Sequence, residues 1–209
     1  MLPESAVEVG RAANVEFALL EAKEVCVHVI AFNTTTSRTR GRSERGNLRI
    51  GAEYKMRLLE LFSGTGSVGR VFEQAGWEVV SVDINPKFNP TICCSVIEIP
   101  LDKWPPGYFD YIHASPPCCE YSIAHTGSTR DMEAGDMLAI YALQLIELLQ
   151  PRWFTLENPQ SGQLKSRPFM QGLPYADVAY CMYGFPYRKR TRIWNNVPGL
   201  TLLNHSCVG

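Results

Sequence analysis

The residues of this chain that are best suited to chemistry lie in Ser115-Pro116-Pro117-Cys118, which follows the apolar run 109–114. Two adjacent prolines fix their own φ angles and restrict the residue before each of them, so this tetrapeptide predicts a rigid turn after a buried strand. In an open α/β sheet, ligands bind at the carboxyl ends of the strands. A cysteine held there is a candidate nucleophile, because a thiolate attacks electrophilic carbon readily. We therefore predict covalent chemistry by Cys118.

A second reactive stretch, Glu157-Asn158-Pro159, follows the apolar run 153–156. A carboxylate that comes directly after a buried strand is better suited to hydrogen bonding or proton transfer in a site than to an ordinary surface position. The basic run 188–192 is expected at the same edge of the sheet, where phosphate contact is a reasonable hypothesis.

A glycine-rich stretch, Gly64-Thr65-Gly66-Ser67-Val68-Gly69, matches the pattern G-x-G-x-x-G between an expected strand and an expected helix. Glycines allow a tight turn and let a ligand approach the backbone at the start of the helix. Asp83 ends the next expected strand, where its carboxylate can accept hydrogen bonds from ribose hydroxyls. NAD, FAD and S-adenosylmethionine sites share this pattern, and a turn that serves packing alone is the remaining alternative.

Alternating strand and helix patterns must position these stretches. Apolar runs predict strands at 58–62, 78–82, 91–96, 109–114, 153–156, 178–182 and 191–194. Helical periodicity predicts helices at 68–75 and 132–149. This order indicates an α/β, Rossmann-like fold with a mostly parallel sheet and helices on both faces. Residues 1–55 differ and are expected to form an N-terminal extension, with a helix at 15–30 and a basic linker at 33–47, before a catalytic domain at 56–209.

Composition fits an ordinary globular protein of 209 residues, with 45% hydrophobic and 20% charged residues. The net charge of −1 gives no overall positive field, so nucleic-acid contact would depend on local basic clusters. The seven cysteines are odd in number and include no C-x-x-C, which is not typical of a disulfide framework or a zinc site, and no metal is expected. Without a signal peptide or a membrane-spanning run, we expect a soluble protein of the cytoplasm or nucleus, with no membrane partner.

Four blocks together resemble the C5-cytosine-specific DNA methyltransferase family. They follow the family's order over residues 57–195 and are Leu61–Gly66, Ser115–Ser122, Glu157–Pro159 and Tyr183–Arg192. The combination is far more specific than any single block, since each block taken alone also occurs elsewhere.

The resemblance implies a mechanism and a set of site residues. Cys118 would add to C6 of cytosine, Glu157 would hydrogen-bond the N3 edge, and Arg190 and Arg192 would orient the base or its phosphate. The methyl group would come from S-adenosyl-L-methionine, and a cytosine in duplex DNA would be flipped out of the helix. The implied cofactor-binding residues are Phe62, Ser63, Gly64, Thr65, Gly66, Ser67, Asp83, Ile84 and Pro116.

The chain departs from the family at several points. Ser95 stands where an acidic residue is expected to contact adenine, and Arg188 stands where glutamine is usual. The sequence shows no target-recognition region after Asn195, so a protein partner would supply recognition. The helix that closes the cofactor site would come from residues 10–30, as in a permuted arrangement.

Other functions are compatible with parts of the pattern. Ser115-Pro116-Pro117 also fits the turn of amino-methylating enzymes, although Cys118 and Glu157 favour C5 chemistry. An RNA substrate stays open, because the motifs describe the base and not the polymer. A catalytically silent module that binds cofactor or nucleic acid and needs a partner is a further alternative. An NAD-dependent oxidoreductase is the last alternative. It would explain the glycine-rich loop but not the presence of Cys118 and Glu157 in their stretches.

Overall fold

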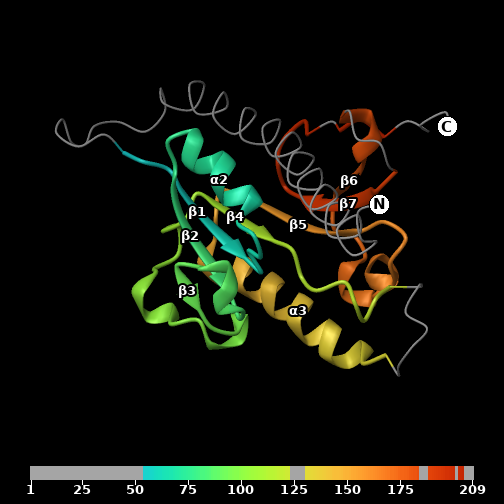
Figure 1. Ribbon diagram of the computed structural model, residues 1–209, viewed down its shortest axis with the longest axis horizontal. Coiled ribbons are helices and arrows are strands. Elements are labelled where there is room, and N and C mark those ends of the chain that lie inside the picture. Colours follow the sequence, from blue (N-terminus) through green and yellow to red (C-terminus); the bar gives the residue numbers. More distant parts are fainter. Residues whose placement is uncertain (1–53, 123–129, 184–187, 201, 205–209) are drawn as a thin grey trace, which may run out of the picture.

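One seven-stranded sheet forms the centre of the computed structural model, which describes residues 54–122, 130–183, 188–200 and 202–204 (Figure 1). Its strand order is β3-β2-β1-β4-β5-β7-β6. The strands are β1 (Arg57–Leu61), β2 (Glu78–Asp83), β3 (Ile92–Cys93), β4 (Tyr111–Ala114), β5 (Trp153–Pro159), β6 (Tyr175–Ala179) and β7 (Arg190–Asn195). Of these described strands, β7 alone runs in the direction opposite to the others. The predicted α/β fold with a mostly parallel sheet is confirmed.

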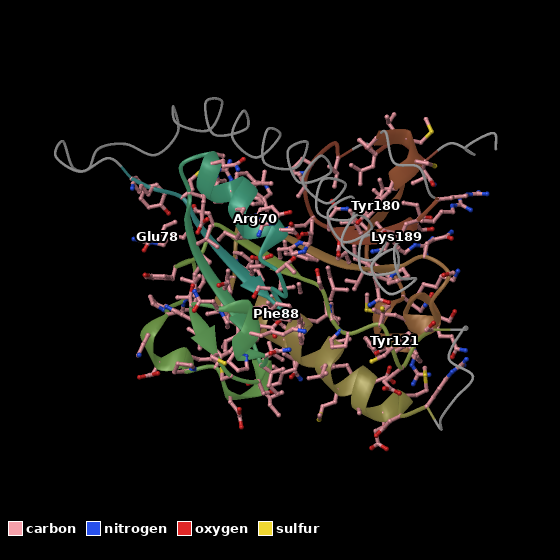
Figure 2. The ribbon with its side chains drawn as sticks, in the orientation of Figure 1. Arg70, Glu78, Phe88, Tyr121, Tyr180 and Lys189 are labelled. Carbon is pink, nitrogen blue, oxygen red and sulfur yellow. The ribbon has the colours of Figure 1, made fainter. Side chains whose placement is uncertain are left out.

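Two α-helices, α2 (Ser67–Gln74) and α3 (Met132–Leu149), cover opposite faces of the sheet (Figure 1). Successive side chains of a strand point to opposite faces, so β1 contributes to both cores. Leu58 is buried in the core under α2, and Leu59 is buried in the core under α3. Figure 2 places Arg70 on α2 and Tyr121 beside the first turns of α3.

The predicted limits of α3 are those found in the structure. Asp131 caps its start, because the Asp131 side chain accepts a hydrogen bond from the Ala134 amide at 2.9 Å. Gln150 ends the helix with φ of 46°, and Pro151 follows it. The left-handed residue and the proline both prevent continuation of the helix.

Two predicted strands are wrong in extent. The strand expected at 91–96 is reduced to Ile92–Cys93, because Ser95 and Glu98 form a capping box that starts the 3-10 helix Val96–Glu98. The strand expected at 178–182 lies at Tyr175–Ala179, and the chain continues as the 3-10 helix Tyr180–Tyr183. Ala179 pairs with Arg190, the first residue of β7, and the Tyr180 amide still donates to the Lys189 carbonyl at 3.1 Å before the chain turns away as a 3-10 helix.

The links from β2 to β4 contain short 3-10 helices in place of α-helices, so the strand–helix alternation is not strict there. Neither α2 nor α3, the α-helices of the described ranges, has the length and apolar character to cross a bilayer. The proposed extension at 1–55 lies almost wholly outside the described residues, and so does the helix expected at 10–30.

Candidate active site

The glycine-rich loop connects β1 to α2 through residues in left-handed backbone conformation. Phe62, Gly64 and Gly66 have φ of 56°, 50° and 69°. A non-glycine residue such as Phe62 is strained in this region, and such strain clusters at functional sites. A Cβ atom at Gly64 or Gly66 would meet no described atom within 4 Å. The outer surface of the loop is therefore free for a ligand to approach.

Asp83 holds the loop in place from the end of the neighbouring strand. Its Oδ2 accepts a hydrogen bond from the Gly64 amide, and its Oδ1 accepts one from the Asn85 amide, both at 2.8 Å. A carboxylate has about four lone-pair sites, so further donors can still be accommodated. Asp83, which is predicted to bind ribose, thus also connects the end of β2 to the loop that follows β1.

The third glycine of the pattern, Gly69, has a different role. Its amide donates to Oε2 of the buried Glu60 carboxylate at 3.1 Å. A Cβ atom at Gly69 would lie 2.6 Å from that oxygen and 3.0 Å from Val79 Cγ1. Gly69 is therefore required by packing between helix and sheet, whereas Gly64 and Gly66 are open on their outer sides.

A cavity of about 260 Å³ lies at the carboxyl ends of β1 to β4. It is lined by Phe62, Val82, Asp83, Ile84, Cys94, Ser95, Val96, Ser115, Pro117 and Leu138. Apolar side chains and one carboxylate suit an adenosine group, because the flat base needs apolar walls and the ribose hydroxyls need an acceptor. The residues present therefore fit the adenosine part of S-adenosylmethionine.

Three predicted cofactor residues, Phe62, Asp83 and Ile84, line this cavity. Ile84 is 71% exposed, so its side chain is accessible to a ligand in this cavity. The other predicted residues, Ser63, Gly64, Thr65, Gly66, Ser67 and Pro116, are not among the lining residues. The first four belong to the adjoining loop and Ser67 begins α2, while Pro116 is replaced in the lining by its neighbours Ser115 and Pro117.

Ser95 lines the cavity in the place where the resemblance calls for an acidic residue. The nearby Glu98 carboxylate is used within the chain, because its Oε2 accepts a hydrogen bond from the Ser95 amide at 3.3 Å. Cys94 lines the same wall, and burial raises the pKa of its thiol, which keeps it protonated.

A chain of buried polar groups lies beneath the Pro-Pro turn. The Tyr111 hydroxyl donates to Thr155 Oγ1 at 3.0 Å, and Thr155 Oγ1 lies 2.7 Å from His113 Nδ1. His113 Nε2 lies 2.9 Å from Ser115 Oγ, at the cavity wall. Both ring nitrogens of His113 are thus hydrogen-bonded to hydroxyls, and the ring supports Ser115 from below.

Cys118 lies on the exposed turn after β4, next to the cavity, and its thiol is free. Asn158 Nδ2 donates to the Pro116 carbonyl at 3.0 Å, in buried surroundings. Since Asn158 follows Glu157 on β5, this hydrogen bond brings the two predicted catalytic segments to one edge of the sheet. The neighbouring Cys119 is also free, and burial together with Glu120 raises the pKa of its thiol.

Arg190 is brought to the same edge because β7 runs antiparallel to β5. The first residue of β7 therefore lies beside the last residues of β5, and the Gln160 amide donates to the Arg190 carbonyl at 3.0 Å. The preceding residues 184–187, which belong to the late block of the resemblance, lie outside the described ranges.

The Arg192 side chain is paired with Asp177 on β6. Its Nε and Nη2 donate to the two Asp177 oxygens at 2.7 and 2.9 Å, and its guanidinium lies 3.6 Å from the centre of the Tyr175 ring. This hydrogen bonding lowers the pKa of Asp177 and raises that of Arg192. Arg192 is registered with Asn158, so its side chain points to the sheet face opposite that of Glu157.

Sequence reasoning missed the residues that connect the site. Asn158 belongs to the block Glu157–Pro159, but its role was not predicted. Its hydrogen bond to Pro116 depends on the pairing of β4 with β5, two strands that are distant in sequence. Ser115 and Pro117 were part of the turn, yet their place in the cavity wall follows only from the fold. Leu138 and Val96 gave no signal beyond being apolar.

The sheet with an antiparallel β7, the glycine loop and the adjoining cavity define a Rossmann-like fold with a site that fits an adenosine-containing cofactor, and the family match makes the chain an S-adenosylmethionine-dependent methyltransferase. The model of the C-5 cytosine-specific DNA methylase family matches residues 56–167. The chain belongs to this family.

Two curated relatives agree with this assignment. Over 170 residues the chain is 36% identical to a protein of Frog virus 3 (isolate Goorha) named "Probable DNA (cytosine-5)-methyltransferase", covering 74% of this chain and 76% of that protein. Over 131 residues it is 28% identical to the type II methyltransferase M.XorII of Xanthomonas oryzae pv. oryzae, covering 54% of this chain and 30% of that protein.

A solved structure supports the fold. It is described as a "putative DNA modification methyltransferase encoded within prophage" (E. coli), with a TM-score of 0.52 and 20% identity. The similarity covers 68% of this chain and 47% of that chain, so the present chain spans less than half of the solved protein.

Proposed function

We propose that this chain transfers a methyl group from S-adenosyl-L-methionine to C5 of cytosine in DNA, with Cys118 as the nucleophile. The observation that carries the proposal is the position of Cys118. Its exposed thiol lies on a turn whose Ser115 and Pro117 line the cofactor cavity, and whose Pro116 is hydrogen-bonded to the residue after Glu157. Family membership supports the reaction class.

The proposed chemistry answers a specific difficulty, because C5 of cytosine is a poor nucleophile. The Cys118 thiolate forms a bond to C6, and the electron pair of the C5–C6 double bond becomes available at C5. Glu157 hydrogen-bonds the N3 and amino edge and stabilises the charge that develops there. S-adenosylmethionine, when bound, would supply an electrophilic methyl group, to which C5 forms a bond as the methyl–sulfur bond breaks and S-adenosylhomocysteine is released. A base then removes the C5 proton, the C6–S bond breaks, and Cys118 leaves as the thiolate.

The two arginines receive different parts in this proposal. Arg190, at the edge that carries Cys118, orients the base or its phosphate. Arg192 contributes to the site through its ion pair with Asp177, which ties β7 to β6 beside the segment that carries Glu157. In duplex DNA, the target cytosine reaches Cys118 after it is flipped out of the helix.

The proposal also includes DNA as the substrate and a second protein as the partner that recognises the target. The family supports DNA as the substrate. A separate protein that supplies target recognition is our expectation from the sequence, and it is tested by adding candidate partners to an inactive preparation.

The test uses duplex DNA that contains 5-fluorocytosine, together with S-adenosylmethionine. Fluorine at C5 blocks the final elimination, so the enzyme stays covalently bound to its substrate. Wild type, Cys118→Ala and Cys119→Ala are compared by denaturing gel and intact mass. Cys119 is the matched control, because it is an adjacent and equally free thiol.

We expect an adduct with wild type and with Cys119→Ala, and none with Cys118→Ala. An adduct that survives in Cys118→Ala would overturn the assignment of the nucleophile. Adducts with single-stranded RNA but not with DNA would overturn the substrate. An absence of adduct despite cofactor binding, on DNA and RNA alike, would favour the silent module that needs a partner.

A further inference from the structure

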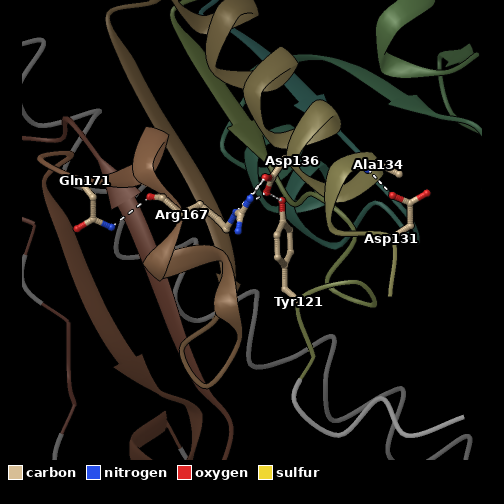
Figure 3. A network of polar contacts seen from close by, with 6 residues as sticks. All are labelled: Tyr121, Asp131, Ala134, Asp136, Arg167 and Gln171. Atoms are coloured by element: carbon tan, nitrogen blue, oxygen red, sulfur yellow. Dashed lines mark hydrogen bonds and ion pairs between the residues drawn. The ribbon is translucent and has the colours of Figure 1, made fainter. Parts of the chain in front are cut away.

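Three segments that are distant in sequence meet at the carboxylate of Asp136 (Figure 3). The Tyr121 hydroxyl donates to Asp136 Oδ1 at 3.0 Å. Arg167 Nε lies 2.9 Å from each Asp136 oxygen, and Arg167 Nη2 donates to Oδ2 as well. Tyr121 comes three residues after Cys118, Asp136 lies near the start of α3, and Arg167 follows the segment that carries Glu157.

Tyr121 is well suited to anchor the turn, because its side chain is completely buried. Its ring packs on Gly135, where a Cβ atom would lie 3.2 Å from Tyr121 Cζ and 3.4 Å from the hydroxyl oxygen. Burial and the Asp136 carboxylate raise the pKa of Tyr121, so the hydroxyl remains a neutral donor. Gly135 leaves space for the Tyr121 ring, and the hydrogen bond to the Asp136 carboxylate fixes the position of the Tyr121 hydroxyl.

Backbone hydrogen bonds extend this anchor to Cys118. The Tyr121 amide donates to the Cys118 carbonyl at 3.1 Å, and the Gln163 amide donates to the Tyr121 carbonyl at 3.0 Å. Asn158 holds Pro116 on the other side. The turn is therefore fastened two residues before Cys118 and three residues after it, and both fastenings lead to the segment that begins with Glu157.

We propose that Tyr121, Asp136 and Arg167 are positioning residues that fix Cys118 relative to Glu157. This inference rests on the proposed function, in which both groups act on one cytosine. A partly exposed ion pair contributes little to stability, whereas a displacement of about 1 Å in a site can cost about a hundredfold in rate. The hydrogen bonds among Tyr121, Asp136 and Arg167 connect the segments that carry Cys118 and Glu157 to α3. Loss of these hydrogen bonds should therefore lower kcat more than it lowers the stability of the protein.

The experiment uses Tyr121→Phe, which keeps the buried ring and removes the hydroxyl. Its matched control is Tyr54→Phe, because the Tyr54 hydroxyl donates to the Asp110 oxygens at 3.0 and 3.1 Å at the opposite edge of the sheet. Arg167→Gln and Arg167→Lys form a second pair, in which lysine keeps the charge but not the planar fork. Each full-length variant is assayed for kcat, for KM of both substrates, and for hydrogen exchange in residues 116–122.

We expect Tyr121→Phe and Arg167→Gln to lower kcat about tenfold with KM for the cofactor unchanged, while Arg167→Lys falls in between. Hydrogen exchange in residues 116–122 should become several-fold faster. Tyr54→Phe should match wild type in both measurements. A kcat equal to wild type in Tyr121→Phe and Arg167→Gln would overturn the proposal, and so would a loss of kcat that is accompanied by an equal loss in cofactor affinity.

Failure of this proposal can be told apart from failure of the proposed function. Unchanged exchange in Tyr121→Phe would overturn the anchoring role, whatever activity is measured. Faster exchange in the variants of a protein whose wild type transfers no methyl group would support the anchor and overturn the proposed function instead.

Discussion

The two ends of the site are held in place by different means. At the cofactor end, the glycine loop is fastened to the next strand by Asp83, which is 19 residues from Gly64 in sequence. At the cysteine end, Pro116 is held by Asn158 across 42 residues, and Tyr121 is held by Asp136 across 15, with Asp136 in turn paired to Arg167 across 31. The first end is a local motif, and the second is an assembly of side chains that depends on the whole sheet.

This difference separates cofactor binding from chemistry. The cofactor loop is shaped by backbone amides that bond to carboxylates, and the turn is aligned by side-chain contacts with later segments. Changes at one end should therefore leave the function of the other end largely intact.

The largest effect is expected from Glu157→Gln, which removes the charge of the group that we propose contacts the cytosine edge. Loss of a group that stabilises the transition state costs about 10²–10³ in kcat. Affinity for S-adenosylmethionine, measured by calorimetry, should stay as in wild type. Glu147→Gln, on the exposed side of α3, is the control with the same change of charge. A fall in cofactor affinity of similar size would show that the two ends are not separate.

Asp83→Asn tests the other end. The amide keeps one acceptor oxygen, so one of the two backbone donors, Gly64 or Asn85, loses its partner. A hydrogen bond to a charged group contributes about 1.5–3 kcal/mol, so cofactor affinity should fall about tenfold or more. At saturating cofactor, kcat should remain within about threefold of wild type. A loss confined to kcat would contradict the binding role of Asp83.

Sequence reasoning succeeded where the structure is local. The loop at 64–69, the strand that ends at Asp83 and the helix at 132–149 follow from turn residues, periodicity and caps within a short window. It failed where a local competitor or a distant partner decides the outcome. The Ser95–Glu98 capping box ended β3 after two residues, and the strand expected at 178–182 ends at Ala179, where the 3-10 helix Tyr180–Tyr183 begins.

Two buried glycines offer a sharper comparison. Gly69→Ala should destabilise the protein by about 1–3 kcal/mol in urea unfolding, because its Cβ atom would lie 2.6 Å from Glu60 Oε2. Gly135→Ala gains about 1 kcal/mol of helix propensity, which offsets its tighter contact with Tyr121. It should therefore stay close to wild type in stability and lower kcat. If both variants lose stability equally and retain kcat, packing at Gly135 has no special relation to the cysteine turn.

The smallest effect is expected from Asp177→Asn, on the edge strand β6. Arg192 lowers the pKa of Asp177 in the folded state, so the carboxylate adds stability above its unfolded pKa of about 3.9, and this stability is lost as pH falls through the folded value. Asp177→Asn should thus be less stable by about 1 kcal/mol at pH 7, with the difference shrinking below about pH 4 in urea unfolding. Glu78→Gln, which breaks the more exposed pair with Arg57, should cost less. Because Arg192 points to the face opposite Glu157, kcat at pH 7 should change less than about twofold, and a larger fall would place Arg192 in the chemical step itself.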